Sequence, residues 1–234
     1  MLWEEAARMS EIAEHLAGIL ERLKTACQKA GRAGEAARLL AVSKTFPVGA
    51  VREAAAAGQE LFGESRVQEA VEKIPQLPSR LRWHFIGHLQ KNKIRKILPL
   101  VEALHSVDSV ELAADIERIG TELGLRPRVF LQVNIAADAS KFGFQPEVLR
   151  GEMERILALR RLEVVGLMTI PPLVPEAEMS RRHFAALREF RDALEREFGV
   201  GLPELSMGMS GDFEVAAEEG ATLVRVGSAI FGGR

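Results

Sequence analysis

The chain has 234 residues, of which 47% are hydrophobic, and a formal net charge of −2 at pH 7. This near-neutral balance argues against a nucleic-acid or membrane-surface partner, and a single cysteine excludes an internal disulfide. No apolar run approaches the roughly 20 residues of a membrane-spanning helix, and the N-terminus lacks the features of a signal peptide. We therefore expect a soluble protein located in the cytoplasm.

The first predicted element is an amphipathic helix over residues 2–31. Its apolar face is predicted to consist of Ile12, Leu16, Leu20, Leu23 and Cys27. Beyond it, short apolar runs alternate with helical patterns along the rest of the chain. Strands are predicted at 39–44, 60–63, 82–86, 104–107, 128–133, 162–168, 204–206 and 221–226. Helices are predicted at 48–57, 66–74, 91–98, 110–123, 146–159, 176–198 and 212–219.

Eight strands that alternate with helices over roughly 200 residues predict an α/β fold, a closed parallel (β/α)8 TIM barrel. An open doubly wound sheet stays an alternative, because periodicity does not show whether a sheet closes. We find no linker, repeat or low-complexity tract, so a single domain is expected over 1–234, with the barrel at about 38–232. In such a barrel the chemistry lies at the carboxyl ends of the strands.

The first predicted strand ends on a lysine, Lys44. Alternate residues of a strand share a face, so Lys44 is expected in line with Leu40 and Val42. One interpretation is a strand-end lysine that extends to water. The other is an amine in a desolvated pocket, where its pKa is lowered and it can attack a carbonyl group. A place at the end of a barrel strand favours the second interpretation.

Two glycine- and serine-rich turns follow the seventh and eighth predicted strands, at 206–212 and 226–228. Backbone N–H groups in such turns bind anions, and barrels often hold phosphate between these two loops. Ser210 and Asp212 could equally cap a helix. Arg225 alternates with apolar residues in the eighth strand, so it needs either a neighbouring carboxylate or a ligand as partner.

Other polar residues give weaker signals. His84 and His88 lie four residues apart, but no accompanying Cys/His set supports zinc, so no metal site is expected. Ser65 and Gln68 have the spacing of a helix capping box. Second-tier candidates for the pocket fall at or after predicted strand ends, and they are His88, His105, Asn134 and Lys141.

Seven motifs together resemble the YggS/PROSC family of pyridoxal phosphate homeostasis proteins. They run in order over nearly the whole chain, at 41–45, 62–69, 83–90, 104–108, 166–169, 205–210 and 224–228. The resemblance implies a single-domain barrel like the N-terminal barrel of alanine racemase, which is a fold-type III pyridoxal-phosphate-binding barrel. One position departs from the family pattern, because Ser65 stands where an asparagine is usual. By this comparison, the shorter side chain would lose a direct contact with the cofactor or would have it replaced by water.

The resemblance also implies how the cofactor is held. Lys44 would form the Schiff base with pyridoxal 5′-phosphate, and Arg225 would face the pyridine nitrogen. Ser210, Gly227 and Ser228 would hold the phosphate. A permanently charged guanidinium at that nitrogen disfavours a protonated pyridinium, so the ring becomes a weaker electron sink.

Three functions are compatible with these features. The first is a binding protein that stores and delivers pyridoxal 5′-phosphate to dependent apo-enzymes, without catalytic turnover. The second is an amino-acid racemase, but alanine racemase uses a tyrosine from a second domain and this chain has no tyrosine. The third, a sugar- or nucleotide-phosphate enzyme, leaves Lys44 without a role. A monomer is expected, although the first helix could also meet a partner.

Overall fold

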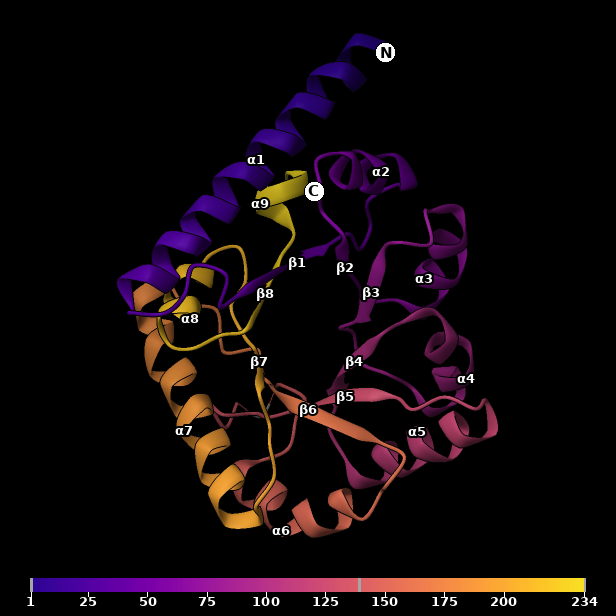
Figure 1. Ribbon diagram of the computed structural model, residues 1–234, viewed down its shortest axis with the longest axis vertical. Coiled ribbons are helices and arrows are strands. Elements are labelled where there is room, and N and C mark those ends of the chain that lie inside the picture. Colours follow the sequence, from indigo (N-terminus) through magenta and orange to yellow (C-terminus); the bar gives the residue numbers. More distant parts are fainter. Residues whose placement is uncertain (1, 139, 234) are drawn as a thin grey trace.

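The computed structural model describes residues 2–138 and 140–233, and side chains are described from residue 11 onward. Eight parallel strands form a closed barrel in the order β1 to β8 (Figure 1). The strands are β1 Arg38–Val42, β2 Leu61–Glu64, β3 Arg82–Phe85, β4 Ala103–Val107, β5 Arg128–Gln132, β6 Glu163–Met168, β7 Glu204–Ser206 and β8 Leu223–Val226. Pairing of β1 with β8, from Arg38 opposite Leu223 to Ala41 opposite Val226, closes the sheet. The barrel is therefore confirmed over the open sheet.

Helices surround the barrel and follow the strands in alternation (Figure 1). They are α1 Leu2–Lys29, α2 Val48–Ala56, α3 Val67–Lys73, α4 Ile94–Ile97, α5 Val110–Glu122, α6 Pro146–Leu157, α7 Arg181–Phe198, α8 Phe213–Glu218 and α9 Ser228–Phe231. The helix expected at 91–98 is a single α-helical turn, α4, between two 3-10 turns. Among the described helices, none has the length and apolar character that crossing a membrane requires.

Helix α1 packs against α2, α8 and α9 (Figure 1). The buried face consists of Ile12, Leu16, Ile19, Leu23 and Cys27. Leu20, which the sequence placed on this face, is 47% exposed, because Ile19 occupies the corresponding position one residue earlier. Arg22 donates to both carboxylate oxygens of Glu214 at 3.0 and 2.7 Å, which ties α1 to α8. Cys27 is a buried free thiol, as expected.

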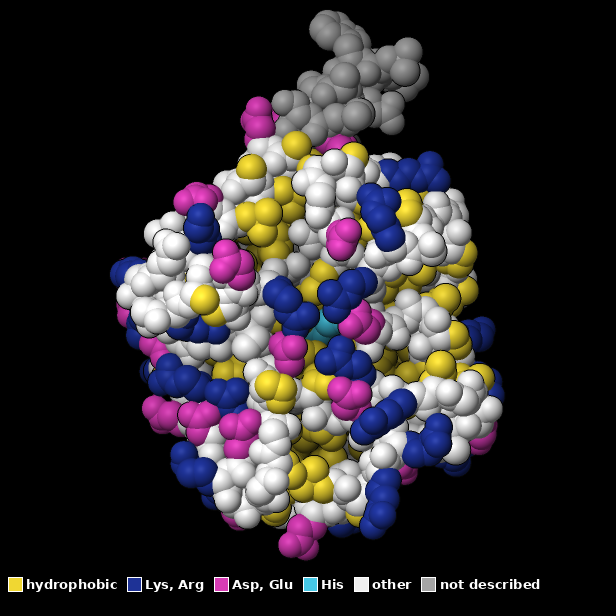
Figure 2. All heavy atoms as spheres, viewed as in Figure 1, with side chains coloured by type: hydrophobic (Ala, Val, Ile, Leu, Met, Phe, Trp, Pro, Cys, Tyr) yellow, Lys and Arg dark blue, Asp and Glu magenta, His cyan; other side chains and the backbone are white. Residues whose placement is uncertain are grey.

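The barrel interior is a separate apolar cluster, distinct from the core between strands and helices. It consists of Leu40, Val42, Leu61, Ala103, Phe130, Val165, Met168 and Leu223. Leu40 and Val42 share this inner face, as the period of two in β1 requires. On the face of the molecule drawn in Figure 2, basic and acidic side chains lie intermixed around the centre.

The amino ends of the strands carry ion pairs between strands. Arg38 at the start of β1 pairs with Glu204 at the start of β7. Glu102, just before β4, accepts hydrogen bonds from Arg82 of β3 and Arg128 of β5. A cavity opens at the opposite, carboxyl ends of the strands.

Candidate functional site

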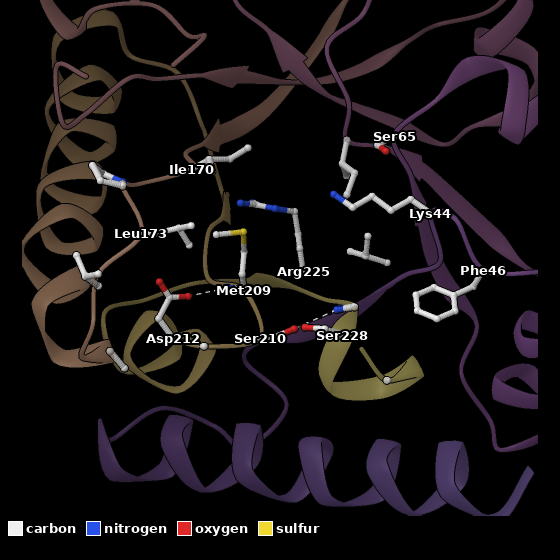
Figure 3. A pocket seen from close by; sticks show the side chains of 18 of the residues that line it. Lys44, Phe46, Ser65, Ile170, Leu173, Met209, Ser210, Asp212, Arg225 and Ser228 are labelled. Carbon is white, nitrogen blue, oxygen red and sulfur yellow. Dashed lines mark hydrogen bonds between the residues drawn. The ribbon is translucent and has the colours of Figure 1, made fainter. Parts of the chain in front are cut away.

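A cavity of about 620 Å³ lies at the carboxyl ends of the strands (Figure 3). Its walls come mainly from the loops after β1, β2, β3, β6, β7 and β8. The five residues predicted to bind the cofactor all line it, and they are Lys44, Ser210, Arg225, Gly227 and Ser228. Barrel closure therefore brings together residues from the two ends of the chain.

Lys44 lies in the turn that follows β1. The prediction that it ends the strand was wrong, because β1 ends at Val42 and the Phe46 N–H group donates to the Ser43 carbonyl at 3.0 Å. Thr45 within this turn has a φ of 70°, a left-handed conformation that is unusual for a β-branched residue. Lys44 is half-buried, and its side chain extends into the cavity (Figure 3).

Ser210 joins the loops that follow β7 and β8. Its hydroxyl oxygen accepts hydrogen bonds from the backbone N–H groups of Gly227 and Ala229, at 3.3 and 3.4 Å. A Cβ atom at Gly227 would lie 3.1 Å from the carbonyl oxygen of Val42, so glycine permits the close approach of this turn to β1. Two backbone donors thus converge on one small polar side chain at the cavity wall.

Asp212 holds the loop after β7. Although it precedes α8, its carboxylate makes no capping bond to that helix. It accepts instead from the Met209 N–H group at 2.8 Å and from the Ser180 hydroxyl at 2.9 Å. The helix-cap alternative for Asp212 is therefore wrong, and the carboxylate links this loop to the start of α7.

Arg225 is the buried cation of the cavity, with only 4% of its surface exposed. Its guanidinium donates to the Ser206 carbonyl at 2.7 Å, the Ser206 hydroxyl at 2.6 Å and the Thr169 carbonyl at 2.8 Å. Burial lowers the pKa of Arg225 to about 10, so the group stays charged at neutral pH. Neutral acceptors hold it, and no carboxylate of the described residues forms a salt bridge with it.

Two histidines extend the Arg225 network through the barrel interior. The Ser206 hydroxyl lies 2.9 Å from His105 Nδ1, and His105 Nε2 lies 2.8 Å from His84 Nδ1. Because Arg225 only donates, a consistent assignment has Ser206 donating to His105, and His105 donating to His84. Burial lowers the pKa of His84 to about 3 and that of His105 well below its usual range, so both are neutral.

The second-tier candidates do not line the cavity. His105 lies inside the barrel, and His88 stacks on Phe142 with ring centroids 4.2 Å apart. The Asn134 side chain donates to the carbonyls of Asp138 and Lys141, at 2.7 and 3.3 Å, and so holds its own loop. Among the described residues, no group of three or more His, Cys, Asp or Glu side chains is placed to hold a metal ion.

Two parts of the cavity wall were missed or misread in the sequence. Ser65 does not cap a helix, since α3 begins at Val67 with no side-chain capping bond, and it lines the cavity instead. The loop after β6 supplies an apolar wall through Ile170, Leu173 and residues between and after them. The Pro-Pro and Pro-rich run at 171–175 was the available signal, but proline predicts a loop and not which cavity it borders.

The family model of the alanine racemase N-terminal domain matches residues 15–234, so the chain belongs to that family. A pyridoxal phosphate homeostasis protein of Aquifex aeolicus is 45% identical over 94% of this chain and 97% of the relative. Another of that name, from Pseudomonas aeruginosa, is 47% identical over 97% of each chain. The predicted resemblance to these homeostasis proteins is thereby confirmed.

Solved structures agree with the fold. PipY of Synechococcus elongatus with pyridoxal phosphate bound has a TM-score of 0.83 at 42% identity, covering 94% of this chain and all of PipY. Alanine racemase of Clostridium difficile has a TM-score of 0.78 at 17% identity and covers 96% of this chain. Only 57% of that racemase is matched, so this likeness shows a shared barrel and nothing about activity.

Proposed function

We propose that this protein binds pyridoxal 5′-phosphate covalently through Lys44 and acts in its homeostasis, by storage and delivery, without catalytic turnover. The observation that carries the proposal is the joint presence, in one cavity, of an amine, a buried guanidinium and a serine–glycine anion cradle. The names of the relatives and the cofactor-bound PipY support the same ligand.

The residues of the cavity fit each part of this cofactor. The cofactor supplies an aldehyde that reacts with amines and a ring that withdraws electrons. Lys44 offers the amine, and the Ser210 and Ser228 hydroxyls offer donors for the phosphate. The Gly227 and Ala229 N–H groups donate to the Ser210 oxygen and so hold that hydroxyl in place. Arg225 is held by three neutral acceptors and presents a fixed positive charge for the ring nitrogen.

That fixed charge bears on the racemase alternative. A cation opposite the ring nitrogen opposes its protonation, which weakens the electron withdrawal that racemisation needs. Among the described lining residues, only Lys44, Asp212 and Arg225 are titratable, and the Asp212 carboxylate is bonded to Met209 and Ser180. A second positioned base is therefore lacking in this part of the chain, which supports binding over turnover.

The proposal also includes the enzymes that receive the cofactor and the compartment in which the protein acts. We infer that pyridoxal-phosphate-dependent apo-enzymes receive the cofactor and that the protein acts as a monomer in the cytoplasm. The homeostasis names of the relatives support the first inference, and the single buried cysteine supports the last.

The direct test is reductive trapping of the reconstituted protein. Borohydride reduction followed by peptide mass spectrometry is expected to place a pyridoxyl group on Lys44. A group found only on surface lysines would contradict the site. Interconversion of D- and L-alanine by the purified, loaded protein would contradict the absence of turnover.

Removal of a cradle hydroxyl is expected to weaken phosphate binding selectively. We expect Ser228→Ala to reduce the affinity for pyridoxal 5′-phosphate by roughly 10- to 100-fold, since a hydrogen bond to a charged group contributes about 1.5–3 kcal/mol. Absorbance titration measures this, and pyridoxal, which lacks the phosphate, is the matched control ligand. Equal losses for the two ligands would show that Ser228 does not contact the phosphate.

A further inference from the structure

We propose that Lys73, Glu64 and Glu69 form a buried ion cluster that positions the Lys44 turn for covalent attachment of the cofactor. The inference rests on the proposed function, because it assigns these residues a role toward Lys44. They lie on β2 and α3, outside the cavity wall.

Lys73 is the centre of the cluster. It is the last residue of α3, and its side chain is only 6% exposed. Its ammonium donates to Glu64 Oε1 at 2.6 Å, to Glu69 Oε1 at 2.9 Å and to the Ser43 carbonyl at 2.9 Å. All three ammonium hydrogens are thereby used, so Lys73 is held in one position and is not free to react with a ligand.

The cluster binds the chain on both sides of Lys44. Before it, the Ser43 hydroxyl donates to Glu64 Oε1 at 2.7 Å, while the Ser43 carbonyl accepts from Lys73. After it, the Thr45 N–H group donates to Glu69 Oε1. Ser43 is therefore anchored to Glu64 and Lys73, and Thr45 is anchored to Glu69. The Lys44 side chain between them extends toward the cavity (Figure 3).

The turn needs such support because its conformation is costly. Thr45 has a φ of 70°, and a left-handed backbone costs roughly 1–2 kcal/mol for a residue that carries a Cβ atom. In this conformation the Thr45 N–H group donates a hydrogen bond to Glu69 on α3. Without that hydrogen bond, the conformation of the turn that directs Lys44 into the cavity is less stable.

A gain in folding stability does not by itself account for this ion cluster. Glu64 is fully buried, burial raises its pKa, and its second oxygen, Oε2, has no hydrogen-bond partner among the described residues. Buried ion pairs are often no more stabilising than apolar side chains of similar size. Their use beside Lys44 is better explained by the directional bonds that they make to Ser43 and Thr45.

The test compares Glu69→Ala with Glu72→Ala, a neighbour on α3 whose exposed carboxylate bonds to Gln68 and not to the turn. We expect Glu69→Ala to slow covalent attachment at Lys44 by about tenfold, as misplacement of a reacting group does. Stopped-flow absorbance and borohydride trapping measure the rate and the site. Glu69→Gln keeps an oxygen for Thr45 N–H and is expected to restore most of the rate.

A second readout does not need the cofactor. In the cofactor-free protein, amides of the 43–46 turn are expected to exchange hydrogen for deuterium faster in Glu69→Ala than in Glu72→Ala. The double variant Glu64→Leu/Lys73→Met removes the buried pair and leaves only the partly exposed Glu69 carboxylate, and it should show the same two effects. If that double variant does not fold, the comparison of Glu69→Ala with Glu72→Ala still tests the inference.

Two results would overturn the inference. One is attachment by Glu69→Ala at the rate of the Glu72→Ala control, and the other is unchanged exchange of the turn. If the unmodified protein forms no adduct at Lys44, the proposed function fails. Hydrogen–deuterium exchange of the 43–46 amides then shows separately whether the ion cluster holds the turn in place.

Discussion

Replacing Lys44 with alanine is expected to abolish covalent attachment of pyridoxal 5′-phosphate. Lys44 is the only lysine among the described residues that line the cavity. The nearby buried Lys73 has its three donors engaged and cannot substitute for it. We expect the visible absorption band of the imine to disappear, and the borohydride-trapped adduct to fall by about 100-fold or more, since no amine remains in position.

The matched controls for this prediction separate the amine from the charge. Lys44→Arg keeps a cation but no nucleophilic amine, so it should fail in the same way. Lys91→Ala removes an exposed lysine, with 61% of its side chain accessible, and should trap cofactor like the unmodified protein. An unchanged adduct on another lysine of Lys44→Ala would show that the attachment site is elsewhere. Non-covalent binding through the phosphate cradle should persist in Lys44→Ala with lower affinity.

The free energy of unfolding is expected to fall as the pH drops from 6.5 toward 3, because His84 cannot take up a proton in the folded barrel. Its pKa is lowered to about 3 from 6.5, chiefly by burial. Between these values the unfolded chain binds a proton that the folded chain does not, so acid favours unfolding. The full penalty from His84 is roughly 5 kcal/mol, and buried His105 adds to it in the same direction.

Urea unfolding as a function of pH measures this effect, with His84→Asn as the comparison. Asparagine keeps a polar atom near the Nδ1 position that bonds to His105, but it does not titrate. Glu64 acts in the opposite direction, since its raised pKa lets the folded state bind a proton first. Both the unmodified protein and His84→Asn contain Glu64, so the difference between their pH-dependent free energies of unfolding isolates the contribution of His84. Parallel stability curves from pH 6.5 to 3 would contradict the prediction.

Much of the fold was readable in the sequence because it depends on local pattern. The period of two in the short apolar runs and the helical period between them predicted all eight strands and the barrel. Element boundaries were less accurate. The sequence extended β1 to Lys44, whereas turn geometry and the left-handed Thr45 end it at Val42. Such endings depend on bonds to distant groups, here the Glu69 carboxylate.

The sequence by itself determined the alternation of strands and helices, the place of Lys44 near a strand end, and the two glycine–serine turns. Only the tertiary structure decided what surrounds them. Arg225 is bonded to Ser206 and Thr169, and Lys73 to Glu64, because barrel closure and helix packing set those neighbours. Local periodicity carries no information on which residue of a distant strand lies opposite. For a buried polar group, that partner determines both its charge state and its role.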